Sequence, residues 1–265
     1  MKPIDTHSHL YMPAFEADRA AVHTRAREAL AAVCLPNVDL ESVPRMLRLA
    51  ASAPDFYFPM IGLHPCSVHE NWEETLAGIK TYLDDPDLTW YGIGETGLDL
   101  YWDTSTLPWQ EAALRVQVQW AKSAGLPLIL HARDAIDPTT ALIAAENEDT
   151  LWGIFHCFDG TPAQALRILE LGGFKLGIGG IVTYRADVQA MVREVPLSGL
   201  VLETDSPYLP PEPHRKAKNR RNESSYTTLV CEAIARIKGL EPEEVAAVTS
   251  QNAQAVFTRI PAITG

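Results

Sequence analysis

The chain has 265 residues, of which 46% are hydrophobic and 21% are charged, and this composition excludes a chain that is disordered along its whole length. Its 34 acidic residues outnumber the 22 basic ones and give a formal net charge of −12, so any attraction to phosphates must be local, through a basic segment or bound cations. The four cysteines are widely spaced, the N-terminus is too polar for a secretory segment, and no apolar run has the length of a membrane span. We therefore expect one cytoplasmic domain that covers residues 1–265.

Short, continuously apolar runs alternate with helix-like stretches along the chain. Such runs suit strands that are buried on both faces, as in a parallel sheet covered by helices. The runs that we interpret as strands are residues 3–6, 31–36, 57–63, 90–94, 128–130, 151–155, 174–178 and 200–204. Eight strand–helix alternations in a chain of this length predict an α/β fold, a distorted (β/α)8 TIM barrel, with a doubly wound open sheet as the alternative.

Helix start and stop signals separate the later runs. Residues 161–164 form a capping box with Pro162 at the first helical position. Residues 110–123 form a long amphipathic stretch that Gly125 closes, and residues 241–244 place acids and a proline at the start of a C-terminal helix. These signals support the alternating pattern.

Metal-competent side chains fall at or just after the ends of the predicted strands. The carboxyl ends of all strands in a parallel barrel meet on one face, so residues that are far apart in the sequence become neighbours there. His7 and His9 lie two residues apart, and such residues point the same way in an extended chain. The six residues in such positions are His7, His9, Glu95, His131, His156 and Asp205.

Each of these residues alone has an ordinary explanation, such as a rim histidine, a turn glutamate or a helix-capping aspartate. Their coincidence on one predicted face favours a metal site. Imidazole and carboxylate together suit zinc, manganese or iron and are too rich in nitrogen for calcium. Six ligands exceed the three of a mononuclear catalytic zinc and suit two ions about 3.5–4 Å apart. We expect two divalent metal ions, with zinc, magnesium and manganese as candidates.

Other catalytic motifs are weak. The sequence contains neither a G-x-S-x-G elbow nor a P-loop, and residues 177–180 lack the dinucleotide fingerprint. Cys157 lies beside His156 and could be a nucleophile, but a packed thiol is favoured because no base with an orienting partner is evident.

Six motifs, taken in order, resemble those of the TatD family. The members of this family are metal-dependent DNases of the amidohydrolase-like barrel superfamily. The resemblance runs from residue 4 to about Phe257, and Gln117 and Asn252 also fit the pattern. The motifs occupy residues 5–9, 62–65, 94–99, 131–134, 156–158 and 203–209.

The resemblance implies two metal sites that share one bridging glutamate. The implied ligands are His7, His9, Glu95 and Asp205 for one ion and Glu95, His131 and His156 for the other. A water or hydroxide between the ions would attack phosphorus, and Asp205 would orient or deprotonate it, so Asp205 and Glu95 are the expected catalytic residues. The family's reaction is hydrolysis of DNA phosphodiester bonds, typically from 3′ to 5′ on single strands. The alternative is an ester or amide hydrolase on the same metal site, such as a D-aminoacyl-tRNA deacylase. A metal-binding protein without turnover is disfavoured by the complete ligand set.

One segment departs from the family pattern. The family commonly carries a compact Arg-Gly-Lys-Arg-Asn-Glu here, whereas residues 214–223 are longer, lack the glycine and hold five basic residues within seven positions. The segment begins soon after Asp205, so we expect it to reach the rim of the site, where Arg220 and Arg221 would contact the substrate backbone. The expected partner is single-stranded DNA or another phosphate-bearing substrate, with no membrane and no obligate protein partner.

Two further residues are expected to face the same cavity without being principal metal ligands. His64 follows the third predicted strand and Arg133 lies two residues beyond His131, and both are expected to contact a substrate phosphate. The structural alternatives are a capping or packing role for His64 and an ion pair of Arg133 with Asp134 or another acid.

Overall fold

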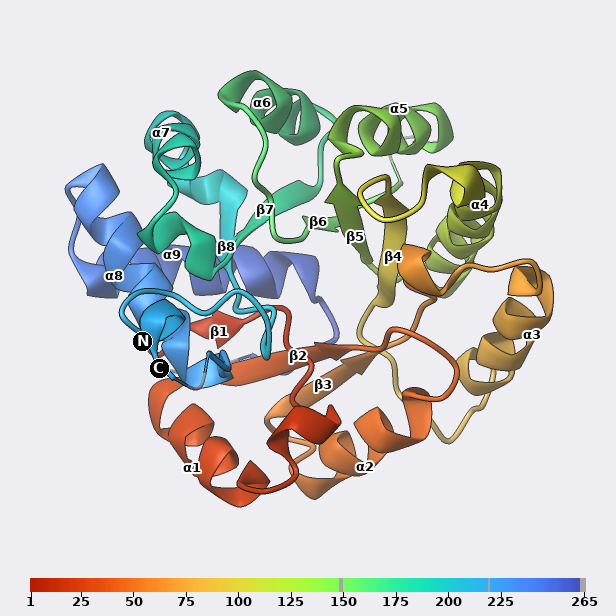
Figure 1. Ribbon diagram of the computed structural model, residues 1–265, viewed down its shortest axis with the longest axis horizontal. Coiled ribbons are helices and arrows are strands. Elements are labelled where there is room, and N and C mark those ends of the chain that lie inside the picture. The colour runs from red at the N-terminus through yellow and green to blue at the C-terminus, as the bar shows by residue number, and fades with distance from the viewer. Residues whose placement is uncertain (148–149, 219, 263–265) are drawn as a thin grey trace.

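The computed structural model describes residues 1–147, 150–218 and 220–262, and within them two parallel sheets together form a barrel (Figure 1). The first sheet has the order β1 (Ile4–Asp5), β2 (Ala32–Pro36) and β3 (Tyr57–Met60). The second has the order β4 (Ile93–Asp99), β5 (Leu128–Arg133), β6 (Gly153–Phe155), β7 (Phe174–Ile178) and β8 (Leu200–Leu202). Strand order follows chain order throughout, which confirms the predicted barrel.

Single bridges join the two sheets at both seams. Ile61 pairs with Ile93 between β3 and β4, and Ser8 pairs with Ser206 beyond the ends of β1 and β8. The barrel is therefore closed, and its distortion lies at these two seams, where regular pairing is reduced to one bridge.

Helices form the outer layer around the strands (Figure 1). They are α1 (Arg19–Ala29), α2 (Val43–Ser52), α3 (Trp72–Leu83), α4 (Leu107–Ala124), α5 (Ile136–Glu146), α6 (Pro162–Glu170), α7 (Ala186–Glu194), α8 (Thr227–Lys238) and α9 (Pro242–Val256). The predicted capping box of α6 is formed, with the Thr161 side chain accepting from the backbone N–H of Gln164. Helix α4 ends at Gly125, whose φ of 59° lies in the left-handed region that glycine adopts freely. Across the described residues, every helix is too short or too polar to cross a membrane.

Side chains alternate between the outer layer and the barrel interior along the strands. Val33 and Leu35 of β2 pack in the large cluster beneath the helices, whereas Ala32 and Cys34 pack in a second cluster. Six strands contribute to this second cluster, which fills the barrel interior, through Ile4, Ala32, Cys34, Phe58, Met60, Ile129, Ile154 and Val201.

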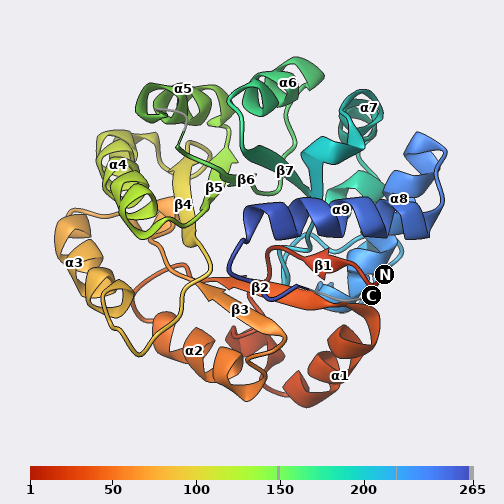
Figure 2. The same cartoon turned by 180° about the vertical axis from the view of Figure 1, so that it is seen from behind.

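Helix α9 and the residues after it close the amino-terminal end of this interior. Figure 2 shows α9 lying across that end of the barrel. Ala253, Val256 and Phe257 are each 1% exposed and belong to the interior cluster. The indole N–H of Trp152 donates to the Val256 carbonyl at 2.9 Å, which ties this end of the chain to the start of β6.

Strand β4 breaks the regular alternation, and this break turns Glu95 inward. Ile93 pairs with Leu128 and Thr96 pairs with Leu130, so three residues of β4 span two residues of β5. Ile93 packs in the outer cluster, and without the extra residue Glu95 would share its outward face. The bulge requires glycine at position 94, because a Cβ there would lie 2.6 Å from the Cβ of Ile129.

The predicted strand bounds are wrong at several positions. The strand predicted at residues 90–94 begins instead at Ile93 and runs through Glu95 to Asp99, and β5 continues past His131 to Arg133. The third strand stops at Met60, before residue 63, because Ile61 makes only a single bridge and side-chain amides replace the ladder from Gly62 onward. The Gln117 carbonyl, for example, accepts the Leu63 N–H at 2.7 Å.

Candidate active site

A cavity of about 630 Å³ lies at the carboxyl-terminal ends of the strands. It gathers residues from β4, β5 and the segments that follow β1, β3, β6 and β8, as the convergence of strand ends in a parallel barrel requires. The cavity is lined by eight of the residues singled out above, namely His9, His64, Glu95, His131, Arg133, His156, Cys157 and Asp205. His7 is fully buried beside them.

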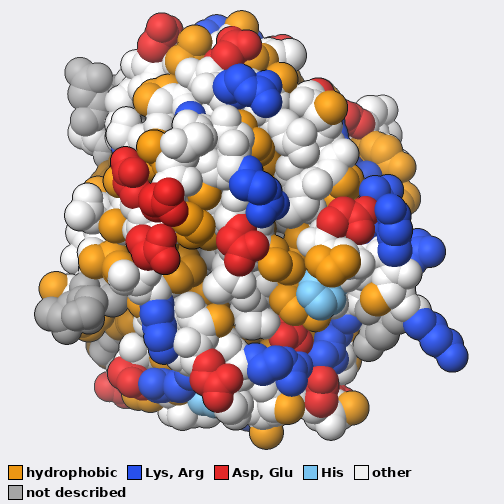
Figure 3. Space-filling view, turned by 90° about the vertical axis from the view of Figure 1, so that its left-hand side faces the viewer, with side chains coloured by type: hydrophobic (Ala, Val, Ile, Leu, Met, Phe, Trp, Pro, Cys, Tyr) orange, Lys and Arg blue, Asp and Glu red, His pale blue; other side chains and the backbone are white. Residues whose placement is uncertain are grey.

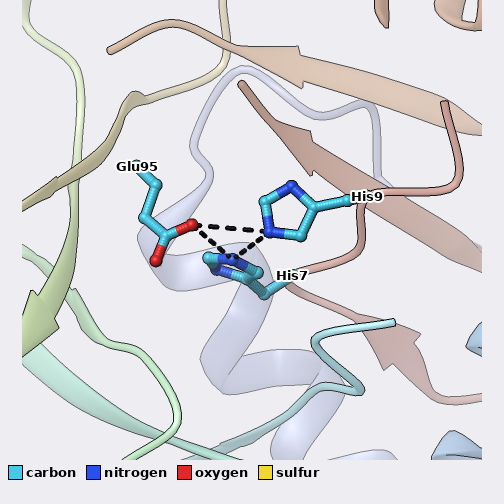
Figure 4. A group of neighbouring side chains, drawn as sticks. All are labelled: His7, His9 and Glu95. Atoms are coloured by element: carbon cyan, nitrogen blue, oxygen red, sulfur yellow. Dashed lines mark hydrogen bonds and ion pairs between the residues drawn. The ribbon is translucent and has the colours of Figure 1, made fainter. Parts of the chain in front are cut away.

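The carboxylate of Glu95 lies between two groups of imidazoles. Its Oε2 atom is 3.2 Å from His7 Nε2 and 3.4 Å from His9 Nε2 (Figure 4). Asp205 belongs to the same group, with its Oδ1 atom 3.4 Å from His9 Nε2 and 3.8 Å from His7 Nε2. This first group combines two imidazoles and two carboxylates.

The other oxygen of Glu95 meets the second group. Oε1 is 3.0 Å from His131 Nδ1 and 3.1 Å from His156 Nε2. The same atom is 3.2 Å from His64 Nε2, which is also 3.3 Å from His131 Nδ1. The structure therefore brings all six proposed ligands together, with the Glu95 carboxylate between the two groups, and adds His64 to the second group.

The donor atoms fit a divalent cation better than hydrogen bonding alone. The ligand atoms of His7, His9 and Glu95 lie within 4.8 Å of one another, and so do those of His64, Glu95 and His131. The two imidazole nitrogens at 3.2 Å in the first group both face one carboxylate oxygen. A single cation placed among these atoms would accept a lone pair from each of them. Nitrogen and oxygen donors suit zinc or manganese.

Three of these histidines are oriented through their other ring nitrogen. Such partners fix the tautomer and the orientation of a ligating imidazole. The pairs are Tyr11 Oη with His9 Nδ1 at 3.0 Å, Asp99 Oδ2 with His131 Nε2 at 2.8 Å, and Glu203 Oε1 with His156 Nδ1 at 3.2 Å.

Sequence reasoning did not single out these orienting residues. A signal existed for two of them, because Asp99 and Glu203 lie within the motifs that carry the family resemblance. Glu203 also lies two residues before Asp205 and so shares its side of the extended chain. The spacing of Tyr11 carried no comparable signal.

The carboxylates and imidazoles of the site favour each other's charged forms and so offset the cost of burying those charges. Burial raises the pKa of Glu95, but the neighbouring imidazoles, led by His64 and His156, hold it well below its usual value. Burial lowers the pKa of His156, yet Glu95 and Glu203 outweigh it and leave the pKa well above the usual value. Burial likewise opposes ionisation of Asp205, but the hydrogen bond with His9 leaves its pKa below the usual value. Both carboxylates are therefore ionised and available as ligands.

His64 lies closer to the candidate ligands than predicted. Its Nε2 atom faces Glu95, as described above, while its Nδ1 atom accepts the backbone N–H of Cys66 at 3.0 Å. The side chain therefore caps the short 3₁₀ helix that begins at Pro65 and also faces the site.

Arg133 lines the cavity, as expected. The structural alternative, an ion pair with Asp134, is not formed among the described residues. Its guanidinium carbon lies 3.6 Å from the centre of the Tyr101 ring, so a cation–π contact positions the side chain instead.

The basic segment divides into two parts. Arg221 donates to both carboxylate oxygens of Asp18, at 2.6 and 2.7 Å, and lies over the ring of Phe15. This guanidinium is turned to Asp18, so the predicted contact of Arg221 with substrate would require that pair to break. Arg220 is placed differently, because it lines a hollow of about 430 Å³ together with Arg215 and other residues.

The hollow beside the cavity is locally basic. Leu209 lines both spaces, so they adjoin, and Lys216 adds a third cation to Arg215 and Arg220. On the face shown in Figure 3, lysine and arginine side chains are interspersed with aspartate and glutamate. Because the net charge of the chain is −12, attraction for phosphate depends on local groups of cations, such as the one at this hollow.

Comparison with known proteins identifies the family. The sequence model described as TatD related DNase matches residues 4–258. The chain is 34% identical over 256 residues to an uncharacterized metal-dependent hydrolase, YabD, of Bacillus subtilis, covering 96% of this chain and 98% of the relative. It is 33% identical over 248 residues to the 3′-5′ ssDNA/RNA exonuclease TatD of a Rahnella species, covering 92% and 93%.

A solved structure agrees with the sequence matches. The crystal structure of YjjV, a TatD homologue from Escherichia coli K12, superposes with a TM-score of 0.88 at 29% identity and covers 96% of this chain and 97% of that chain. The family match over nearly the whole chain, on a closed barrel whose strand ends gather imidazoles around Glu95, establishes that this protein belongs to the TatD-related DNase family of metal-dependent hydrolases.

Proposed function

We propose that this protein is a divalent-metal-dependent exonuclease that hydrolyses the phosphodiester bonds of single-stranded DNA from the 3′ end. The observation that carries the proposal is the position of Glu95 between two groups of nitrogen and oxygen ligands that line a cavity. Two ions placed on either side of one carboxylate are suited to an in-line displacement at phosphorus. The 33% identity to a protein named as a single-stranded DNA and RNA exonuclease supports this substrate class.

The proposed ligands divide between two sites. His7, His9 and Asp205 would hold one ion with Glu95, and His131 and His156 would hold the other with Glu95. Zinc, magnesium and manganese are the candidate metals, and the proximity of His64 to Glu95 Oε1 makes it a further candidate ligand of the second site. Cations held there would lower the pKa of a water molecule and offset charge on the phosphoryl oxygens.

Asp205 is the proposed general base. Its side chain is 16% exposed, whereas that of Glu95 is 3% exposed, so Asp205 is the carboxylate that a water molecule in the cavity can reach. Its φ of 55° is uncommon for a residue with a side chain, and the backbone N–H is fixed by donating to the His7 carbonyl at 2.9 Å. Asp205 would orient the water molecule and hold its proton on the carboxylate.

A cytoplasmic location fits the same proposal. All four cysteines are free, and Cys34 and Cys231 are buried thiols. Free, packed thiols are typical of a reducing compartment.

The test is a release assay with protein that has been stripped of metal and reloaded with zinc, magnesium or manganese. The substrates are single-stranded DNA labelled at the 3′ or the 5′ end, the matching duplex, and a D-aminoacyl-tRNA. We expect early release of the 3′ label from the single strand, lost again on chelation. Deacylation of the aminoacyl-tRNA without nucleotide release under any metal would replace this function with the ester-hydrolase alternative.

A further inference from the structure

Two exposed aromatic side chains lie in the loop between β4 and α4. Trp102 is 70% exposed and Tyr101 is 52% exposed. Covering a large aromatic ring lowers the free energy. A pair of rings left in water at a functional cavity therefore indicates a contact surface. Trp102 lines the same cavity as Glu95 and Asp205.

The loop is held in place rather than left free. Asp99 Oδ1 accepts the backbone N–H of Tyr101 at 3.0 Å and that of Trp102 at 3.3 Å. The two rings meet edge to face, with centroids 4.8 Å apart and planes at 89°. Arg133 supports them with its guanidinium carbon 3.6 Å from the Tyr101 centroid and 5.5 Å from the Trp102 centroid. A surface fixed in this way loses little entropy when a ligand binds.

The same aspartate connects the aromatic loop to the candidate metal site. Its other oxygen, Oδ2, is 2.8 Å from His131 Nε2, while His131 Nδ1 faces Glu95. Asp99 is 2% exposed, so both of its contacts are shielded from water. The backbone that carries Trp102 is therefore anchored to the same side chain that orients His131.

We propose that Trp102, supported by Tyr101 and Arg133, is a stacking platform for an unpaired nucleobase of the strand that is being cleaved. The proposal rests on the nucleic-acid substrate proposed above. Every base presents a π-face, so a platform of this kind binds without sequence preference. A base inside a duplex is already stacked on both sides, so the platform favours single strands. The cation of Arg133 lies beside the ring and suits the adjoining phosphate.

Substitution of the exposed ring tests the proposal. Trp102→Ala is expected to raise KM for a single-stranded oligonucleotide about 5- to 150-fold, equivalent to stacking worth about 1–3 kcal/mol, with little change in kcat. Trp102→Phe keeps an aromatic face and is expected to recover most of the affinity. The matched control is Trp109→Ala, because Trp109 is a 40% exposed ring of α4 that is not among the described residues lining the cavity.

A second measurement separates stacking from a structural role. Oligonucleotides with one abasic position, moved stepwise from the 3′ end, are bound to chelator-treated protein and followed by fluorescence anisotropy. One abasic position is expected to weaken binding to the wild-type protein and to have no effect on Trp102→Ala. Equal binding of intact and abasic strands by the wild-type protein at every position would overturn the platform. Base-dependent binding through Trp102 without cleavage under any metal would preserve the platform and overturn the exonuclease.

Discussion

The amino-terminal end of the barrel interior is filled with aliphatic and aromatic side chains and closed by α9, whereas the carboxyl-terminal end holds imidazoles around buried carboxylates. The change occurs within single strands. Val201 belongs to the apolar cluster, while Glu203 and Asp205, two and four residues further on, belong to the site. Apolar burial supplies stability, and buried polar groups cost stability unless each is paired. The barrel thus places the apolar packing that stabilises it at one end of the interior and the candidate active site at the other.

The largest effect is expected from the residue between the two ligand groups. Glu95→Gln removes the charge that both proposed metal sites share, so we expect loss of both ions together and a fall in kcat of about 10³-fold or more. Elemental analysis and a single-strand cleavage assay measure the two effects. Glu232→Gln on the outer helix α8 is the charge-matched control, since Glu232 is 51% exposed. Full two-metal occupancy in Glu95→Gln would remove the bridging role.

Replacement of the proposed base, which is also a proposed metal ligand, should lower turnover far more than substrate affinity. Asp205→Asn keeps the size and one oxygen of the side chain but cannot accept the proton of a water molecule. We expect kcat to fall by roughly 10²–10⁴-fold, with KM within a few-fold of the wild-type value. Steady-state kinetics on one oligonucleotide separates the two constants. Near wild-type turnover would show that the proton goes elsewhere.

A substitution at the apolar end of the barrel should lower stability and leave turnover unchanged. Phe257→Ala opens a cavity beneath α9, where the ring is 1% exposed, and should lower the free energy of unfolding by about 3–5 kcal/mol. Urea denaturation measures this loss, while kcat of the folded variant should stay unchanged well below its unfolding temperature. The control is Leu166→Ala on α6, which is 44% exposed and should change stability by no more than about 0.5 kcal/mol. A kcat loss as large as the one expected for Asp205→Asn would show that the two ends are coupled.

The smallest effects concern the two neighbouring arginines. Arg220→Ala should raise KM for DNA a few-fold and reduce the salt dependence of binding by about 0.7 units of slope, since it removes one proposed phosphate contact. Arg221→Ala should leave KM unchanged and lower stability by about 0.5–1 kcal/mol, because its pair with Asp18 is partly exposed to solvent. The opposite assignment of these effects would mean that the Arg221–Asp18 pair opens when substrate binds.

The sequence predicted those features that depend on local periodicity. The eight apolar runs predicted the strands and their order, because each run is buried on both faces and bounded by turn signals. The convergence of strand ends then brought His7, His9, His131 and His156 to one place, as the barrel topology requires.

The features that escaped prediction depend on contacts between distant segments. The inward turn of Glu95 comes from an extra residue opposite β5, which the pattern around Gly94 does not reveal. The pairing of Arg221 with Asp18 joins residues 203 positions apart, and a run of basic residues gives no indication of such a partner. In both cases the conformation depends on a partner that is distant in the sequence, namely β5 for Glu95 and Asp18 for Arg221.

Closure of the barrel by α9 also sets an order of events during synthesis. β1 pairs with β2, which follows it closely in the chain, yet its other neighbour β8 comes nearly 200 residues later, and α9 follows all eight strands. The apolar interior that Phe257 covers can therefore be closed at its amino-terminal end only after the last strand has been made. A chain that has not yet docked α9 exposes this apolar surface, and such surfaces make incompletely folded chains prone to association.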